Sequence, residues 1–234
     1  ERAFRRSKRR AKDLRRIMGA RREADVMRED FLALARRASM TENDVQGALA
    51  LFQLTDAVLT VKQAYPPSRL VRHGVDLMTL AEQPESPLPL HDLAASHLYR
   101  RAEQAALHVD SLRDPKLVPE HHELRIRFKS LRYSVELMAE PFSEFIDGPG
   151  WVRTLKRLQD GLGVLNDIQD LIAWMNSKRV AKALGKAALQ PLNVVAEQLQ
   201  AERYETARDL VQAEAPRLIS ALRRAAGHVG PLPA

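Results

Sequence analysis

The sequence of 234 residues contains no cysteine and few aromatic residues. Without cysteine there can be no disulfide framework, no thiolate metal site and no cysteine nucleophile. The 2 Trp, 4 Tyr and 6 Phe, together with only 10 Gly and 13 Pro, are too few for a β-sandwich or barrel, whose strands and turns are rich in these residues. The composition therefore favours an all-α protein.

Long hydrophobic runs are also missing. No stretch approaches the roughly 18 apolar residues that a transmembrane helix needs, and residues 1–20 are basic throughout, which excludes the apolar core of a signal peptide. Hydrophobic residues make up 45% of the chain and charged residues 29%, as in globular proteins. We therefore expect a folded cytoplasmic protein with no membrane contact, with the length of one large domain or two small ones.

Positive charge is concentrated at the start of the sequence. The formal net charge is +7, but residues 1–22 contain 11 Lys or Arg against two acidic residues and contribute +9, which leaves −2 for the remainder. Of the 37 basic residues, 28 are Arg, whose planar guanidinium can hold phosphate or carboxylate oxygens in pairs. This pattern favours a polyanionic partner, and the alternative is a solvated basic helix without a ligand.

Helix start and stop signals divide the chain into helical segments, and no convincing strand pattern is present. N-cap candidates at residues 39–44 predict a helix from Val45 to Lys62, and a shorter one is expected over residues 69–82. The proline-rich stretch 83–89 is the best midpoint of the chain. Beyond it, turns that include Gly163 and Pro216 separate expected helices at 91–112, 119–140, 150–161, 164–178, 190–213 and 215–226.

The two halves of the chain resemble each other at a constant offset of 144 residues, which aligns Leu14 with Leu158. The same offset pairs two basic positions and one glycine: Arg9 with Arg153, Lys12 with Lys156, and Gly19 with Gly163. These matches predict a duplicated helical unit related by a pseudo-twofold axis. Chance similarity between two amphipathic helices is the alternative.

The segment 121–138 has an unusual distribution of charge on a helical wheel. One arc holds a mainly basic stripe, made of His122, Arg125, Lys129, Arg132 and Glu136. Apolar residues flank this stripe on both sides, with Leu124, Phe128, Leu131, Val135 and Met138 on one and Ile126, Tyr133 and Leu137 on the other. The remaining arc is the expected solvent face and holds Glu123, Arg127, Ser130 and Ser134.

A basic stripe between two apolar flanks should face an enclosed space rather than bulk solvent. Burying three cations without partners would cost more free energy than a marginally stable domain can lose. Glu136 offsets only one of the charges on Arg125, Lys129 and Arg132. The stripe therefore predicts a basic cavity that contains water, carboxylates or an anion.

At these residues the chain resembles the CHAD, or conserved histidine α-helical domain, family. The stripe is similar to the family's second signature helix, and two further segments resemble the turns of its two halves: His122-x-x-Arg125-Ile126-x-x-Lys129-x-x-Arg132-Tyr133-x-x-Glu136, Leu162-Gly163-x-x-Asn166-Asp167 and Met18-Gly19-x-x-Arg22-Glu23-x-Asp25-Val26. The resemblance implies two helical bundles related by a pseudo-twofold, with a basic central cavity that binds inorganic polyphosphate and has no catalytic activity. We therefore expect a single domain over residues 1–234, with halves 1–88 and 89–234.

The sequence departs from the family pattern at its start. The first half of the family normally begins with its own His-x-x-Arg helix, and no counterpart of it precedes Arg5. We therefore expect that this leading helix, and with it part of the anion site, is missing. Glu23 also replaces the usual Asp of the first turn.

The candidate phosphate ligands fall into three groups. Arg125, Lys129 and Arg132 come first, with His122 at the edge of their stripe, where a packed neutral histidine is the alternative. The basic positions of the repeat and its surroundings follow, and two more arginines complete the set: Arg9, Lys12, Arg16, Arg153 and Lys156, then Arg5 and Arg22. No metal-ligand spacing and no cofactor motif is present.

The preferred function is non-enzymatic binding of inorganic polyphosphate or a similar polyanion, in the cytoplasm and with polyphosphate granules as one location. Nucleic-acid binding is an alternative, although the scarcity of aromatics disfavours single-strand stacking. A phosphoanhydride-processing enzyme is the other, for which Asp160, Asp167 and Asp170 would be the metal ligands. The sequence indicates no oligomeric state.

Overall fold

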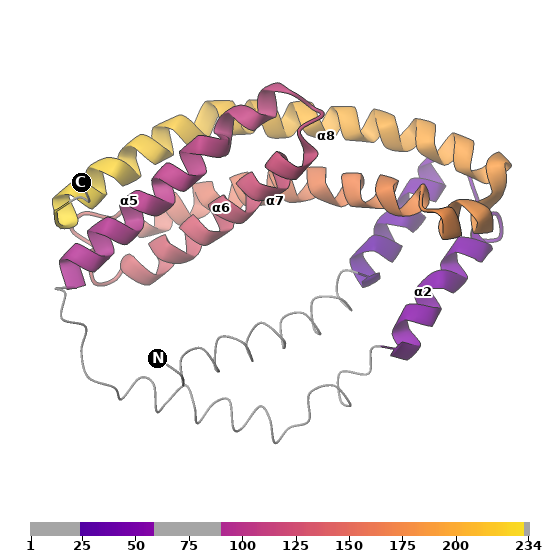
Figure 1. Ribbon diagram of the computed structural model, residues 1–234, viewed down its shortest axis with the longest axis horizontal. Helices are drawn as coiled ribbons and strands as arrows, with labels where there is room; N and C mark the ends of the chain where they lie inside the picture. Colours follow the sequence, from indigo (N-terminus) through magenta and orange to yellow (C-terminus); the bar gives the residue numbers. More distant parts are fainter. Residues whose placement is uncertain (1–23, 59–89, 232–234) are drawn as a thin grey trace, which may run out of the picture. The chain divides into compact units, whose positions relative to one another are not determined.

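The computed structural model of the chain describes residues 24–58 and 90–231, and every regular element in these ranges is helical (Figure 1). The all-α prediction is therefore confirmed. A helical stretch at residues 24–37 precedes α2 (Gln46–Val58), α5 (Leu90–Val109), the 3₁₀ helix η1 (Asp110–Arg113), α6 (Val118–Met138), α7 (Gly148–Met175) and α8 (Lys178–Val229). None of the helices in the described ranges is long and apolar enough to cross a lipid bilayer. The expected helix at 69–82 and the linker at 83–89 lie outside the described residues.

Two predicted helix breaks are wrong. The predicted turn at Gly163 lies inside the continuous helix α7, and the predicted turn at Pro216 lies inside α8. In each case buried apolar residues continue at helical spacing on both sides of the expected break, as Leu158, Leu162 and Leu165 do around Gly163. The burial of this stripe outweighs the low helix propensity of one glycine or the one backbone hydrogen bond that a proline removes.

A real change of direction occurs at Gly185. This residue interrupts α8 with φ 71° and ψ 164°, a backbone conformation that favours glycine because it has no Cβ. The break falls between the expected helices 164–178 and 190–213. Nearby, Asn176 and Asn193 exchange two side-chain amide hydrogen bonds of 3.1 and 3.2 Å, which join the end of α7 to α8.

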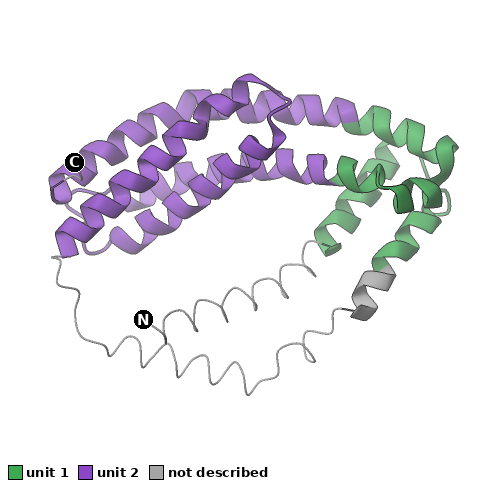
Figure 2. Ribbon diagram, viewed as in Figure 1, with its two compact units in different colours: residues 1–85, 171–196 green, residues 86–170, 197–234 purple. Residues whose placement is uncertain are grey.

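The chain forms two compact units (Figure 2). Unit 1 comprises residues 1–85 and 171–196, and unit 2 comprises residues 86–170 and 197–234. The segment 171–196 thus belongs with the N-terminal residues rather than with the second half of the chain. In unit 1, Trp174 stacks on Phe52 with 4.5 Å between ring centroids and meets Phe31 edge-on at 5.2 Å. The pseudo-twofold relation of the halves stays a prediction.

Unit 2 is a helical bundle with a mainly aliphatic core. Helices α5 and α6 pack against each other, and the parts of α7 and α8 in this unit complete the bundle (Figure 1). The side chains of Leu98, Leu124, Phe128, Leu158 and Leu222 are fully buried in it. This packing places one side of α6 in the core and fixes its other sides relative to α5 and α7.

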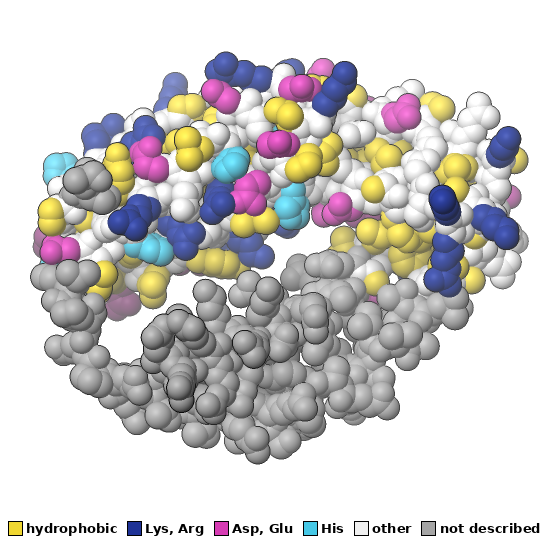
Figure 3. Space-filling model, viewed as in Figure 1, with side chains coloured by type: hydrophobic (Ala, Val, Ile, Leu, Met, Phe, Trp, Pro, Cys, Tyr) yellow, Lys and Arg dark blue, Asp and Glu magenta, His cyan; other side chains and the backbone are white. Residues whose placement is uncertain are grey.

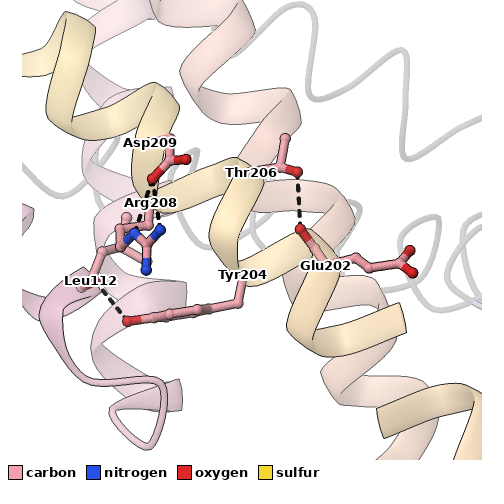
Figure 4. Close-up of polar contacts among 6 residues, drawn as sticks. All are labelled: Leu112, Glu202, Tyr204, Thr206, Arg208 and Asp209. Atoms are coloured by element: carbon pink, nitrogen blue, oxygen red, sulfur yellow. Dashed lines mark hydrogen bonds and ion pairs between the residues drawn. The ribbon is translucent and has the colours of Figure 1, made fainter. Parts of the chain in front are cut away.

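Tyr204 of α8 anchors the connection between α5 and α6 (Figure 4). Its hydroxyl donates a 2.7 Å hydrogen bond to the carbonyl oxygen of Leu112, and its ring lies 5.8 Å from that of the fully buried His121. His121 Nε2 lies 3.1 Å from the carbonyl oxygens of both Ser111 and Asp114. Side chains from α6 and α8 therefore hold the same short loop.

Replacing Tyr204 by phenylalanine should reduce the free energy of unfolding by about 1 to 2 kcal/mol, because the buried Leu112 carbonyl loses its donor while the ring is kept. Urea unfolding at neutral pH measures this difference. Tyr133→Phe is the matched control, since Tyr133 is 50% exposed and should lose little. Equal losses in the two variants would contradict an anchoring role for Tyr204.

Stability should also fall with alkaline pH through Tyr204. Burial raises the pKa of the Tyr204 hydroxyl above its ordinary value of about 10. As pH rises, the unfolded tyrosine therefore ionises first, so this contribution is fully present below about pH 10 and is lost as pH rises through the raised pKa of the folded state. Tyr204→Phe should lose less stability than the wild type between roughly pH 9 and 11, and parallel curves would reject this assignment.

Candidate anion-binding site

Helix α6 carries the predicted basic stripe along one edge of its buried side. Proline in the first turn and Glu120 near the start favour helix formation there. The first predicted apolar flank is buried, with Leu124, Phe128 and Leu131 fully inaccessible to solvent. Beside it, Arg125, Lys129 and Arg132 are half-buried and His122 is exposed. The guanidinium and ammonium groups thus lie at the boundary between core and solvent.

The second predicted apolar flank is exposed. Ile126, Tyr133 and Leu137 are 39%, 50% and 77% exposed. The guanidinium carbon of Arg132 lies 4.6 Å from the centre of the Tyr133 ring, which gives this cation an aromatic neighbour. Within the described ranges the stripe is therefore enclosed on one side, and the complete cavity stays a prediction.

The predicted solvent face of α6 is wrong, because α5 packs against it. Ser134 is only 6% exposed, donates a 3.0 Å hydrogen bond to the Ser130 carbonyl and lies 3.0 Å from His97 Nε2. Arg127 forms an ion pair with Glu123 and donates a 3.3 Å hydrogen bond to Gln104 of α5.

His97, which contacts Ser134, has a lowered pKa. Burial, and secondarily the charge of Arg101, lowers the pKa of His97. The neutral imidazole is thus the favoured form beside Ser134. The polar arc of α6 is therefore an interface that joins α5 to α6, and Arg127 is a structural residue of that interface.

The basic stripe meets α7 in an antiparallel arrangement, in which later residues of α6 contact earlier residues of α7. Arg132 Nε donates a 3.1 Å hydrogen bond to Gln159 Oε1, and the His122 Nδ1 atom lies 3.4 Å from the Asn166 amide nitrogen. Between these two contacts the Arg125 guanidinium lies beside Gly163. The three α7 positions 159, 163 and 166 have spacings of four and three residues, so they share one face of that helix. Helix α7 therefore supplies one wall for the stripe.

Arg153 and Lys156 extend the set of cations along the start of α7. Both are exposed, and Arg153 lies six residues and Lys156 three residues before Gln159, which is about two turns and one turn. Because α6 and α7 run antiparallel, these cations lie farther along the same pair of helices, past Arg132. They border an open hollow of about 590 Å³ whose other lining residues are Asp147, Gly150, Trp151, Thr154, Arg157 and Asp160.

Acidic residues neutralise only part of this charge. Glu136 pairs with Arg132 at 2.8 Å, and Glu214 of α8 pairs with Arg157 at 2.9 Å. No ion pair involves Arg125 or Lys129 within the described residues. Figure 3 shows that cations on the face in view lie among acidic, histidine and apolar side chains rather than in one separate patch. Ion pairs therefore account for Arg132 and Arg157 but not for Arg125 or Lys129 within the described residues.

The remaining candidates are the basic residues near the start of the chain and a metal site. Arg5, Arg9, Lys12, Arg16 and Arg22 lie outside the described residues, so their role as phosphate ligands stays a prediction. In the ranges that the structure describes, no group of three or more histidine or acidic side chains is placed to hold a metal ion.

Two polar partners of the stripe were not predicted as site residues. Gln159 contacts Arg132 and Asn166 contacts His122, whereas the sequence motif includes only Asn166, at the turn predicted for Gly163. Their seven-residue spacing could have revealed them, because residues seven apart lie on the same face of a continuous helix. That face packs against the part of α6 from His122 to Arg132. The presumed turn at Gly163 concealed this face.

The sequence was also compared with known proteins. A family model described as "CHAD domain" matches residues 1–176, which is most of the chain. The comparison with curated proteins and the comparison with solved structures gave no match. The matched range includes α6, all the cations of the α6–α7 pair and their α7 partners. The chain therefore belongs to the CHAD domain family, which is associated with polyphosphate binding.

Proposed function

We propose that this protein binds inorganic polyphosphate, without chemical turnover, along the cations of α6 and α7. The observation that carries the proposal is the row of half-buried cations on α6 at Arg125, Lys129 and Arg132, of which only Arg132 forms an ion pair, with Glu136, among the described residues. Membership of the CHAD family supports the same ligand class.

The spacing of the cations suits a linear ligand with many charges. Arg125, Lys129 and Arg132 are separated by four and three residues, so they span about 10 Å of helix at 1.5 Å per residue. Lys156 and Arg153 continue in the same direction on α7, with a comparable separation of three residues. An extended polyphosphate can therefore meet several cations in succession, and each contact raises the local concentration of phosphate at the next.

The partial burial of Arg125, Lys129 and Arg132 strengthens the contact that each can make with a phosphate. A phosphate oxygen that approaches a half-buried guanidinium is screened less by salt and water than one at a fully exposed side chain. Charge-assisted hydrogen bonds from Arg are also directional, and the guanidinium can donate two of them to one phosphate. The site thus combines general electrostatic attraction with defined geometry.

Affinity should fall steeply with salt and rise with the length of the polyphosphate. Binding of a polyanion releases its condensed counterions, so the logarithm of the association constant should decrease linearly with the logarithm of salt concentration. Titrations with short and long polyphosphates at several salt concentrations measure both trends. Affinity that is independent of salt, or the same for triphosphate and long chains, would refute the electrostatic mechanism.

Removing one cation of the stripe should weaken binding much more than removing an exposed lysine elsewhere. Lys129→Ala should lower the affinity for long polyphosphate roughly 5- to 30-fold, equivalent to about 1 to 2 kcal/mol, because one charge-assisted contact is lost. Isothermal titration at fixed salt measures this effect. Unfolding stability should change little, since no ion pair of Lys129 is present in the described residues.

The matched control is Lys116→Ala, which removes the same charge from the exposed connection before α6. Its effect should stay below about twofold, as expected for a screened surface charge. Arg127 is unsuitable as a control because it forms an ion pair with Glu123 and a hydrogen bond with Gln104, so its removal would also disturb the packing of α5 on α6. Equal losses in the two lysine variants would mean that the polyanion binds diffusely. Shortening of the polyphosphate during incubation with Mg²⁺ would instead indicate an enzyme.

A further inference from the structure

We propose that Gly163, Gln159 and Asn166 of α7 are positioning residues that fix the α6 side chains Arg125, Arg132 and His122 before an anion arrives. This inference rests on the proposed function, and it assigns a role to residues that carry no charge. Its basis is the antiparallel register, in which each of three stripe residues meets a different residue of one α7 face.

Gly163 is the centre of this arrangement. It lies in the interior of a continuous helix, where glycine is less favourable than alanine, and it is buried. A Cβ atom at this position would lie 3.3 Å from Arg125 Nε, which is tighter than most Cβ contacts, and 3.7 Å from Nη2, which is ordinary van der Waals contact. The missing side chain therefore provides the space in which the Arg125 guanidinium lies. This steric reason replaces the turn that the sequence predicted.

Packing rather than hydrogen bonding holds the inner edge of the Arg125 guanidinium, that is, its Nε atom. Its Nε atom is inaccessible to solvent and has no hydrogen-bond partner within the described residues. A larger residue at 163 would push this edge outward, and no bond of Nε would oppose the displacement. The orientation of the outer nitrogens, which are the ones able to meet a phosphate, is thus sensitive to the size of residue 163.

The neighbouring contacts orient the other two side chains. Gln159 accepts a hydrogen bond from Arg132 Nε, and Glu136 accepts one from Arg132 Nη1, so two sides of this guanidinium are fixed. Asn166 is 5% exposed, and its amide lies beside His122 Nδ1. An amide N–H donated to Nδ1 places the imidazole proton on the outer Nε2 atom.

Fixing these side chains in advance reduces the loss of rotamer entropy when the ligand binds. Long side chains such as Arg lose the most freedom on being ordered. The uncharged α7 residues should therefore raise affinity for polyphosphate without touching it.

Gly163→Ala tests the proposal, and Gly161→Ala is its matched control. Both replacements put alanine in α7, but a Cβ at 161 would meet only the movable end of the Leu210 side chain at 3.0 Å. With long-chain inorganic polyphosphate at fixed salt, Gly163→Ala should lower affinity roughly 5- to 10-fold and Gly161→Ala less than about twofold. In an Arg125→Ala background, Gly163→Ala should have no further effect on affinity. An equal loss in that background would overturn the proposal.

A ligand-free measurement separates this inference from the proposed function. The unfolding stabilities of wild type, Gly163→Ala, Arg125→Ala and the double variant form a thermodynamic cycle. Gly163→Ala should be more favourable when Arg125 is absent, because the steric conflict is relieved. Additive effects on stability would overturn the proposal. If the wild type binds no polyphosphate while the cycle is non-additive, the proposed function fails and the contact between Gly163 and Arg125 stands.

A second variant keeps the test decisive if Gly163→Ala does not fold. Gln159→Met retains the length of the side chain but cannot accept the hydrogen bond from Arg132 Nε. It should reduce polyphosphate affinity about 3- to 10-fold in the wild type and have no effect in an Arg132→Ala background. A loss of the same size in both backgrounds would show that Gln159 does not act through Arg132.

Discussion

The antiparallel packing of α6 against α7 is the constraint on which the candidate site depends. Leucines on both helices are buried in the core of unit 2, and this burial fixes the distance and register of the pair. The polar residues at the edge of the contact then have fixed neighbours, such as Gln159 for Arg132. Because hydrophobic burial sets the register, Arg125 and Lys129 are held in place without an ion pair to any described residue.

The cations lie where two opposing requirements are both met. Full burial of Arg125 or Lys129 would cost more than the fold can offset, whereas full exposure would leave each contact with an anion screened by water and salt. Half-burial at the edge of the core avoids most of the desolvation cost and also limits the screening. The aliphatic parts of these long side chains cover apolar surface while their charged ends reach solvent. Core packing and the proposed anion binding would therefore use the same residues.

Much of α6 could be predicted from the sequence alone. Its helical period, its buried flank and the basic stripe all follow from local spacing, because a helix places residues three and four apart on one side. The errors concern surroundings. A helical wheel predicts a solvent position for Arg127 and Ser134 because it gives directions but not neighbours, and α5 covers that arc. The low helix propensity of Gly163 predicts a turn because it is a local property, whereas the leucine stripe that continues α7 is stabilised by residues distant in the sequence.

The sequence by itself determined that the chain is helical, that Arg125, Lys129 and Arg132 form a stripe on one side of their helix, and which family the chain belongs to. Only the tertiary structure decided which uncharged residues meet that stripe and why position 163 is a glycine. The physical reason is that helix periodicity and charge are properties of neighbours along the chain. The contact between Arg125 and Gly163 instead joins residues 38 positions apart, and the packing of two helices sets their separation.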